Sequence, residues 1–543
     1  MKNLKNQLPQ GTYDFLPDEC DKKTALEMKL RQQFVAQGYR EIQTPAFEYY
    51  DVFTHDSVPY GQENMIKFFD LSGRILVLRP EMTVPIARVA ATKLLQKEKS
   101  LRLFYLQNVY GYLNDSVNEQ SEVCQAGVEL IGVPGCDGDT EVVRLAIECL
   151  KLTGLAGFKL EVGDVSFFKG LIADAGLSDE QEETIRALID TKNTVELEYT
   201  LDTLQLPYAV KRKLLALPNL FGEGEVFDAA YALAENDLCK RAVDNLKEIY
   251  ERICILGLKD YITVDFGLLN NYKYYSGIIF RGITNEVGSP ILSGGRYDNL
   301  LGEFGTPAPA TGFALRIREI LSAMEKSAAA QQLQDHTLTI ALAKGRLAKK
   351  TQELLAQCGV DVSALEDEGR KLILEDAKNN IRFLMVKPSD VPVYVYHGVA
   401  DMGVVGKDTL LEAGLPMYEV LDLKCARCKM SVAGYEGRAP MGNVRKIATK
   451  YPRIAQKYYA SKGEDIEIIK LHGSIEIAPM LGLSDVIVDI VESGRTLKEN
   501  GLCVLEDICD ITARLVVNRV SMKTKTTKIA PLIEKMRALL EEK

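Results

Sequence analysis

The sequence predicts two units of different fold class in one chain, an α+β unit followed by an α/β unit. Its 543 residues exceed what one hydrophobic core usually supports. The hydrophobic fraction of 46% and the charged fraction of 26% are typical of a globular protein. Near residues 325–336 a helix-like run ends in small and polar residues (EKSAAAQQLQDH), and an apolar strand pattern follows. We therefore predict a first domain at 1–327, a linker at 328–336 and a second domain at 337–543.

The first domain mixes strand and helix patterns. The segments LRLFYLQNVYGYL (101–113) and SEVCQAGVELIGV (121–133) have the composition of antiparallel strands. Residues 166–256 carry helical periodicity with few strand signals, and strand patterns return at ITVDFGLL and YYSGIIFRGI. These patterns predict an antiparallel sheet interrupted by a helical insertion.

The second domain alternates strand and helix patterns throughout. LTIALA precedes the helical LAKKTQELLAQCG, ADMGVVG precedes KDTLLEAG, and DVIVDIV precedes RTLKEN. Such alternation predicts parallel α/β sheets with ligands at the carboxyl ends of the strands.

Charge and composition narrow the functional class. The net charge of −10 disfavours a long nucleic acid as partner. The charge is uneven, because residues 337–543 hold 31 Lys and Arg against 28 Asp and Glu, and residues 1–336 hold 35 against 48. The N-terminus has no apolar signal segment, and no apolar stretch is long enough to cross a bilayer. Eleven scattered cysteines fit reduced thiols. We expect a cytoplasmic protein that binds neither membrane nor nucleic acid.

Candidate ligand-binding residues are most concentrated in the segment GLSDVIVDIVESGRTLKENGL (482–502). Asp485 and Asp489 stand four residues apart in an apolar strand, and so on the same face of it. Ser493, Gly494 and the residues after them then open a helix, where backbone N–H groups and hydroxyls can converge on a phosphate. The neighbouring carboxylates could hold ribose hydroxyls. An ordinary strand-to-helix turn with a hydroxyl cap is the alternative.

The segment DVIVDIVESGRT resembles the phosphoribosyl-pyrophosphate motif of phosphoribosyltransferases. Together with ALAKGRLAKKTQELL and KPSDVPVYVYHGVADMGVVGKDTLLE, it resembles the short form of ATP phosphoribosyltransferase over nearly all of 337–543. The resemblance implies a two-lobed fold similar to periplasmic binding proteins, with the active site between the lobes. It implies that N1 of the adenine of ATP is joined to C1 of the ribose with loss of diphosphate, and that Mg²⁺ is the metal.

This reaction needs positive charge on the departing diphosphate more than a strong base, because adenine N1 is already nucleophilic. Lys344 and Arg346 in AKGRL and Arg370 in EGRKLIL match family positions that serve this role. Solvated surface charges are the alternative for any one of them. The resemblance assigns phosphoribosyl-pyrophosphate binding to Asp485, Asp489, Glu492, Ser493, Gly494, Arg495 and Thr496. We assign no protein ligand to the metal.

Residues 1–325 resemble histidyl-tRNA synthetase, a class II enzyme built on an antiparallel sheet. LPQGTYDFLPDE, LRPEMTVPIARV, QAGVELIG and SGGRYDNLLGEFG occur in the family order. The departures from the family pattern concern groups that bind ATP and activate the amino acid. They are Gly111 and Leu113 in the second class II motif, the reversed pair Arg318 and Glu319 in the third, and Asn270 and Lys273 ahead of the tyrosine pair. These losses argue against amino-acid activation.

The residues that would hold the amino acid are retained. Glu81, Gln125 and Tyr274 match positions that hold histidine in the synthetases, and Glu129 and Tyr275 stand beside them. Carboxylate, amide and phenol groups can bind an ammonium and an imidazole. Alternatively, they only satisfy one another in a buried ancestral pocket.

A synthetase-like domain without activation residues resembles the regulatory subunit of short-form ATP phosphoribosyltransferase. We therefore expect one chain with a regulatory and a catalytic domain that uses ATP and phosphoribosyl pyrophosphate, is inhibited by histidine, and forms a homo-oligomer. Two rival readings remain. One is a working histidyl-tRNA synthetase with an appended domain, and the other is a histidine-binding regulator whose transferase is inactive.

Overall fold

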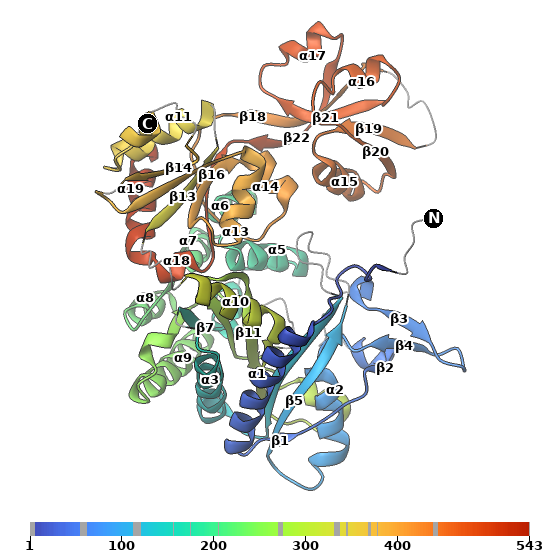
Figure 1. Ribbon diagram of the computed structural model, residues 1–543, viewed down its shortest axis with the longest axis vertical. Helices are drawn as coiled ribbons and strands as arrows, with labels where there is room; N and C mark the ends of the chain where they lie inside the picture. The colour runs from blue at the N-terminus through green and yellow to red at the C-terminus, as the bar shows by residue number, and fades with distance from the viewer. Residues whose placement is uncertain are drawn as a thin grey trace. The chain divides into compact units, whose positions relative to one another are not determined.

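The computed structural model describes residues 6–54, 62–111, 121–155, 157–173, 175–204, 206–269, 275–330, 337–343, 346–366, 371–376, 378–437 and 444–541. The chain divides into two compact units, Met1–Asp335 and His336–Lys543 (Figure 1). Helix α10 (Ile317–Ala330) extends past residue 327 into the segment expected to be the linker. Across the described ranges, no helix is both long and apolar enough to span a membrane.

A nine-stranded sheet forms the centre of the first unit. Its strand order is β1-β5-β6-β12-β11-β10-β7-β9-β8. The bounds are β1 Arg40–Glu41, β5 Leu101–Tyr110, β6 Glu122–Ile131, β12 Ala310–Arg316, β11 Val287–Arg296, β10 Ile278–Thr284, β7 Phe158–Asp164, β9 Ile262–Asp265 and β8 Phe221–Gly222. Neighbours from β5 to β7 pair antiparallel, as the sequence predicts.

Two pairs in this sheet depart from the antiparallel prediction. Strand β1 pairs parallel with β5, and β7 pairs parallel with β9, so the sheet is mixed. Parallel neighbours need a long crossover connection. For β7 and β9 the helical insertion supplies it: α4 Val165–Ile172, α5 Asp179–Asp190, α6 Thr194–Thr203, α7 Tyr208–Ala216, α8 Val226–Leu233 and α9 Asp237–Ile255.

The two faces of the sheet are covered differently. Helices α1 (Pro17–Ala36), α3 (Gly135–Leu152) and α10 pack on one face (Figure 1). Leu26, Leu30 and Phe34 of α1 recur every four residues, so they form one apolar stripe that is fully buried in this layer. Helix α2 (Thr83–Val89) buries Val84 and Ile86 in a second core on the other face.

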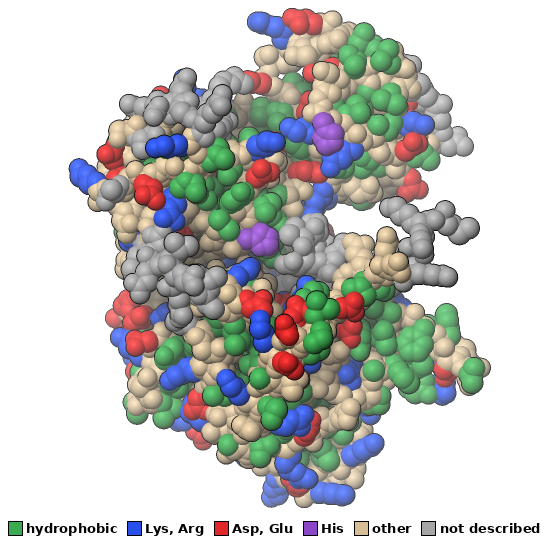
Figure 2. Space-filling view, viewed as in Figure 1, with side chains coloured by type: hydrophobic (Ala, Val, Ile, Leu, Met, Phe, Trp, Pro, Cys, Tyr) green, Lys and Arg blue, Asp and Glu red, His purple; other side chains and the backbone are tan. Residues whose placement is uncertain are grey.

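A small sheet leads into α2. It has the order β2-β4-β3, with β2 Phe47–Tyr49, β4 Ile75–Leu78 and β3 Lys67–Phe69. Val77 of β4 is buried in the core beside α2, whereas Phe69 is 72% exposed, and hydrophobic side chains gather on the surface here (Figure 2). Strand β4 ends three residues before Glu81, so this sheet sets the position of that side chain.

The second unit holds two sheets. The first has the order β14-β15-β13-β16-β23-β17 and the second β20-β19-β21-β18-β22. In the first sheet the bounds are β14 Ile373–Asp376, β15 Ile381–Val386, β13 Leu338–Ala343, β16 Met402–Gly406, β23 Ala513–Val517 and β17 Tyr418–Asp422. In the second they are β20 Ile466–Lys470, β19 Arg445–Thr449, β21 Val486–Val491, β18 Cys428–Gly434 and β22 Cys503–Ile511.

The prediction of parallel sheets in this unit is right for only three strands of each sheet. Strands β15, β13 and β16 are parallel to one another, and so are β20, β19 and β21. The remaining pairs are antiparallel, and both sheets are mixed. Strands β14 and β15 follow one another directly along the chain. The other antiparallel pairs involve β23 or β18, which lie where the chain passes from one sheet to the other, since β17 leads into β18 and β22 into β23.

Candidate functional site

A cavity of about 260 Å³ lies in the first unit, on the face of the central sheet that α2 covers. Its floor comes from strands β5, β6, β12 and β11, and one wall from the turn between β4 and α2. The polar side chains that line it are Glu81, Thr83, Tyr105, Tyr110, Gln125, Glu129, Tyr275, Ser293, Tyr297 and Arg316. The cavity therefore gathers residues from segments more than 200 positions apart.

Strand register explains why these side chains meet. Gln125 pairs with Arg316, and Glu129 pairs with Gly312, across β6 and β12. Alternate residues of a strand share a face, so Gln125 and Glu129 both project into the cavity. A β-carbon at position 312 would lie 2.0 Å from Oε2 of Glu129 and 2.4 Å from the carbonyl oxygen of Val128. Only glycine at this position leaves room for the carboxylate.

Glu81 stands just before the N-terminus of α2. Its carboxylate accepts hydrogen bonds from the backbone N–H of Val84 at 2.7 Å and of Thr83 at 2.9 Å. The side chain is nevertheless buried, and burial raises the pKa of Glu81 to about 7 against the opposing effect of these bonds. Near neutral pH this group is therefore poised to gain or lose its proton.

Glu129 lies beside it on β6. The hydroxyl of Thr83 donates to its Oε1 at 3.1 Å, and the phenol of Tyr297 donates to its Oε2. Burial raises the pKa of Glu129 to about 8, and the nearby charge of Glu81 adds to the rise. Burial also raises the pKa of Tyr297 well above its ordinary value, so the phenol stays neutral and acts as a donor.

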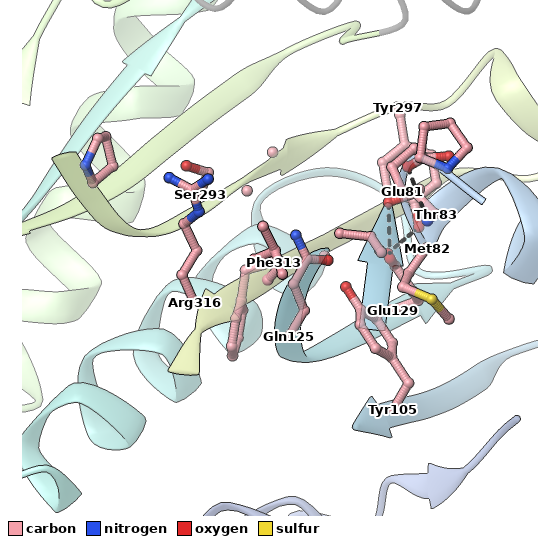
Figure 3. Close-up of a pocket in the computed structure, with 18 of the residues that line it drawn as sticks. Glu81, Met82, Thr83, Tyr105, Gln125, Glu129, Ser293, Tyr297, Phe313 and Arg316 are labelled. Atoms are coloured by element: carbon pink, nitrogen blue, oxygen red, sulfur yellow. Dashed lines mark hydrogen bonds between the residues drawn. The ribbon is translucent and has the colours of Figure 1, made fainter. Parts of the chain in front are cut away.

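The cavity has two chemically different ends (Figure 3). Glu81, Thr83 and Tyr297 lie together at one end, and Arg316 and Ser293 lie at the other, with Gln125 between them. Two carboxyl groups with raised pKa values favour a ligand that brings positive charge, because a cation stabilises their ionised form. An ammonium or imidazole group has the chemistry that this end accepts.

The structure brings most of the predicted amino-acid residues together. Glu81, Gln125, Glu129 and Tyr275 line the one cavity. Tyr274 lies outside the described residues, as do Asn270, Lys273 and Leu113.

The reversed pair of the third motif takes up two different positions. Arg318 stacks over the ring of Tyr13, 4.4 Å from its centroid and away from the cavity lining. Glu319 is buried, with its Oε1 3.5 Å from Nε of Arg316. Gly111 lines the cavity and brings no charge to it.

Sequence reasoning missed Thr83, Tyr297 and Arg316. Thr83 and Tyr297 both lie inside the synthetase-like motifs, so a signal existed for them. Arg316 follows Gly312 and Ala314 at alternate positions, so it is a charged residue on a strand face whose neighbouring side chains are small. Only the pairing of β12 with β6 shows that this face lines the cavity.

In the second unit the predicted phosphate loop follows β21. Glu492, Ser493, Arg495 and Thr496 are exposed, and Gly494 precedes the short helix α17 (Arg495–Glu499). The φ of Gly494 is 68°, a left-handed conformation that glycine adopts without strain. The Arg495 N–H donates to the Ser493 hydroxyl at 3.5 Å. The loop is open to solvent at the carboxyl end of a parallel strand, where α/β proteins bind ligands.

The two predicted ribose-binding aspartates are separated. Asp489 lies near the carboxyl end of β21, and burial raises its pKa, with nearby Glu476 and Asp408 acting in the same direction. Asp485 precedes the strand and accepts a hydrogen bond from the Lys446 N–H at 2.8 Å. It therefore stands at the far end of the strand from the loop and ties β21 to β19.

The carboxyl edges of the two sheets meet at Asp408. This residue follows β16, and it accepts a hydrogen bond at 3.0 Å from the phenol of Tyr451, which follows β19. Sequence reasoning missed this link. Arg346 begins helix α11 (Arg346–Gln357) directly after β13, but its side chain, Lys344 and Arg370 lie outside the described residues. Among the described residues, no group of three His, Cys, Asp or Glu side chains could hold a metal.

Comparisons with known proteins agree with this division. The histidyl-tRNA synthetase family matches residues 11–320, and the ATP phosphoribosyltransferase family matches residues 387–538. An ATP phosphoribosyltransferase regulatory subunit of Acetivibrio thermocellus is 44% identical over 326 residues, which cover 60% of this chain and 78% of that protein.

Solved structures are similar as well. The crystal structure of an ATP phosphoribosyltransferase regulatory subunit/histidyl-tRNA synthetase from Bacillus halodurans has a TM-score of 0.55 and 31% identity, covering 65% of this chain and 90% of that one. A chain of the ATP phosphoribosyl transferase (HisG:HisZ) complex from Thermotoga maritima has a TM-score of 0.35 and 40% identity, covering 38% of this chain and all of that one. The chain thus belongs to the histidyl-tRNA synthetase-like family of ATP phosphoribosyltransferase regulatory subunits and also carries an ATP phosphoribosyltransferase domain.

Proposed function

We propose that histidine regulates the ATP phosphoribosyltransferase of this chain by binding in the cavity of the first unit. Domain 1–327 is then the regulatory part and domain 337–543 the catalytic part. The transferase joins ATP to phosphoribosyl pyrophosphate and releases diphosphate, at the start of histidine biosynthesis. The observation that carries the proposal is the convergence of Glu81, Gln125, Glu129 and Tyr275 on one cavity.

The chemistry of the cavity supports an amino acid with a basic side chain. Glu81 and Glu129 can bind an ammonium and an imidazole, since both are buried and close enough for the charge of one to raise the pKa of the other. A bound cation favours the ionised carboxylates, and the burial that opposes their charge in the empty cavity strengthens the attraction. The volume of about 260 Å³ is of the order needed for a small metabolite.

The transferase site is proposed at the carboxyl edges of the two sheets of the second unit, arranged as the two lobes of a periplasmic-binding-protein-like fold. In this proposal the exposed loop Ser493–Thr496 binds the 5′-phosphate of the sugar, and Asp489 binds the ribose hydroxyls. Asp485 precedes β21 and accepts a hydrogen bond from the Lys446 N–H, so the proposal gives the ribose hydroxyls to Asp489 alone. Lys344, Arg346 and Arg370 supply positive charge to the departing diphosphate.

Magnesium is proposed to enter with the diphosphate group. Mg²⁺ usually keeps several waters and binds through substrate phosphates plus one or two carboxylates. The acidic groups Asp408 and Asp489 are close enough for the charge of Asp408 to raise the pKa of Asp489, which fits this donor chemistry. Mg²⁺ would neutralise charge on the leaving diphosphate.

The rival synthetase reading is disfavoured by the positions of the departures. Arg318, which stands in the third motif, stacks on Tyr13 away from the cavity, and Glu319 is buried against Arg316. Gly111 leaves a wall of the cavity without a guanidinium. A site that activates an amino acid needs arginines on the phosphates of ATP, whereas the described lining holds a single arginine, Arg316, which is paired with Glu319.

Initial rates of diphosphate release, measured over a range of histidine concentrations, test the regulatory proposal. Glu81→Gln keeps the size of the side chain and one of the two oxygens that accept the N–H groups of Thr83 and Val84, but it removes the charge. We expect the half-inhibiting concentration of histidine to rise roughly ten- to hundredfold, because the loss of a charge-assisted hydrogen bond costs about 1.5–3 kcal/mol. Each variant's rate without histidine serves as its own reference.

Glu122→Gln is the matched control, because Glu122 starts the same strand as Gln125 but is exposed and bonded to Asn108. It should keep the histidine sensitivity of the wild type. Full sensitivity of the Glu81→Gln variant, or simple competition between histidine and ATP, would show that histidine acts elsewhere.

A further inference from the structure

Arg316 puts a guanidinium into a cavity whose other ionisable lining groups are carboxyls and phenols. It is the last residue of β12 and pairs with Gln125 of β6. Gly312 and Ala314 precede it at alternate positions on the same face, so nothing larger than a methyl group separates it along the strand from the acidic end. The arginine therefore faces the same space as the predicted amino-acid residues.

The contacts of Arg316 leave its terminal nitrogens available. Its Nε lies 3.5 Å from Oε1 of Glu319, one helical turn into α10, and in the described part of the chain this is its only ion pair. The contact with Glu319 uses Nε, the guanidinium nitrogen nearest the backbone of Arg316. The two terminal nitrogens can therefore donate hydrogen bonds to a ligand. A guanidinium is permanently charged and presents parallel N–H groups that match a carboxylate.

The arrangement of charges along the cavity gives a ligand its direction. Figure 3 shows Arg316 and Ser293 at the end opposite Glu81 and Tyr297, with the amide of Gln125 between the two groups. A free amino acid with a basic side chain fits this order, because its α-carboxylate lies at one end, its protonated ring lies at the other, and its ammonium shares a carbon with the carboxylate. The charges of the site are thus opposite to those of the ligand at each end of the cavity.

We propose that Arg316 binds the α-carboxylate of the regulatory ligand and so makes the cavity select a free amino acid over the corresponding amine. This inference rests on the proposed function, because it takes histidine as the ligand. Glu81 and Glu129 bind the positive groups of the ligand, Gln125 lies between them and Arg316, and Arg316 binds the carboxylate. Arg316 is a specificity-determining residue of the regulatory site and takes no part in the transferase reaction.

Calorimetric titration of the full chain with histidine and with histamine, which lacks the carboxylate, tests the assignment. The wild type should bind histidine roughly ten- to hundredfold more tightly than histamine, the range expected for a charge-assisted hydrogen-bonded pair. Arg316→Gln should weaken the binding of histidine by a similar factor and leave the affinity for histamine within about threefold of the wild-type value.

Two further variants separate binding from folding. Arg316→Gln leaves Glu319 buried without its partner, so Arg316→Gln combined with Glu319→Gln removes both charges and should show the same loss of selectivity. Arg318→Gln is the matched control, since this neighbouring arginine stacks on Tyr13 outside the cavity lining. It should bind both ligands as the wild type does.

The outcomes distinguish the two proposals. If the wild type binds histidine and histamine equally, or if both Arg316 variants keep the wild-type preference, Arg316 only neutralises Glu319 and the inference is wrong, while histidine regulation stands. If the wild type binds no histidine at millimolar concentration, the proposed function fails and the inference fails with it.

Discussion

Two glutamates in the cavity show how burial decides the protonation of a side chain. Glu81 accepts two backbone N–H bonds and Glu129 accepts two hydroxyl bonds, and each of these bonds lowers a carboxyl pKa. Both pKa values are nevertheless raised, because the loss of hydration outweighs the bonds. Glu19 on the surface shows the opposite result, since hydrogen bonds from Tyr13 and the Leu16 N–H lower its pKa with little burial against them.

The first prediction concerns the pH dependence of stability. The folded state holds a proton on Glu129 up to about pH 8, whereas the unfolded chain releases it near 4.5. The wild type therefore loses stability as pH rises from about 4.5 through 8, since the native state binds more protons there. Glu129→Gln lacks this dependence. Urea unfolding at about pH 5 and pH 9 should show the wild type losing on the order of 1 kcal/mol or more relative to the variant.

Glu122→Gln removes an exposed carboxyl from the same strand and should follow the wild-type profile. Parallel pH profiles for the wild type and Glu129→Gln would mean that the carboxyl is not protonated in the folded state.

The second prediction concerns the hydroxyl of Thr496 in the phosphate loop. If the loop holds the sugar 5′-phosphate, Thr496→Ala should weaken the binding of phosphoribosyl pyrophosphate by roughly ten- to hundredfold, because a charge-assisted hydrogen bond is lost. ATP binding should change much less. Titration of each substrate separately measures both constants, and Thr496→Ser, which keeps the hydroxyl, should recover most of the loss. Equal weakening of both substrates would place the loop elsewhere in the site.

Among the secondary-structure elements, strand β12 leaves space for the cavity because most of its side chains on that face are small. Its residues on the cavity face are Gly312, Ala314 and Arg316, so the middle of a buried sheet stays open above them. On the opposite face Phe313 and Leu315 are buried under the helices. A strand usually fills both faces when it is covered on both sides. Here the small residues of one face preserve a binding volume.

The third prediction tests this use of glycine. Gly312→Ala would place a methyl group 2.0 Å from Oε2 of Glu129, so the carboxylate has to move. We expect a loss of about 1–3 kcal/mol in the free energy of unfolding, typical of overpacking, together with weaker histidine binding. Gly302→Ala is the matched control, since the nearest atom to an added β-carbon there, in Pro307, is 3.8 Å away. Unchanged histidine binding in the Gly312→Ala variant would show that Glu129 does not contact the ligand.

At the scale of the whole molecule, one chain joins a synthetase-like unit to a transferase domain. Covalent linkage keeps the two at a fixed ratio. Regulation of the transferase through the first unit requires histidine to bind two states of the protein with different affinity, since a ligand that binds both equally shifts nothing.

The fourth prediction distinguishes regulation from aminoacylation. Given histidine and Mg²⁺, the purified protein should not exchange labelled diphosphate into ATP. Gly111 and Glu319 stand where the family places phosphate- or carboxylate-binding groups, and Arg318 lies on Tyr13 instead. The exchange is measured without phosphoribosyl pyrophosphate, so the transferase contributes nothing to the signal. Histidine-dependent exchange well above background would restore the synthetase reading.

Features with a local physical cause could be predicted from the amino-acid sequence. Alternating apolar runs predicted the strands β5 and β6, helical periodicity predicted the insertion at 166–256, and the DVIVDIVESGRT segment predicted a strand, a loop and a helix start. Hydrophobic periodicity reports which face of an element is buried, and turn residues report where it ends. Motif order was enough to indicate that Glu81, Gln125 and Tyr275 belong to one site.

Features that depend on partners distant in sequence could be seen only in the folded protein. Strand direction is one case: β16 and β23 are almost wholly buried and form mostly apolar runs, so neither run carries a local signal of their antiparallel pairing. The role of Asp485 is another, since its hydrogen bond goes to an amide 39 positions away. Arg316 is the third. Its side chain belongs to the cavity only because β12 pairs with β6 in one register, and that register is set by packing across the whole sheet.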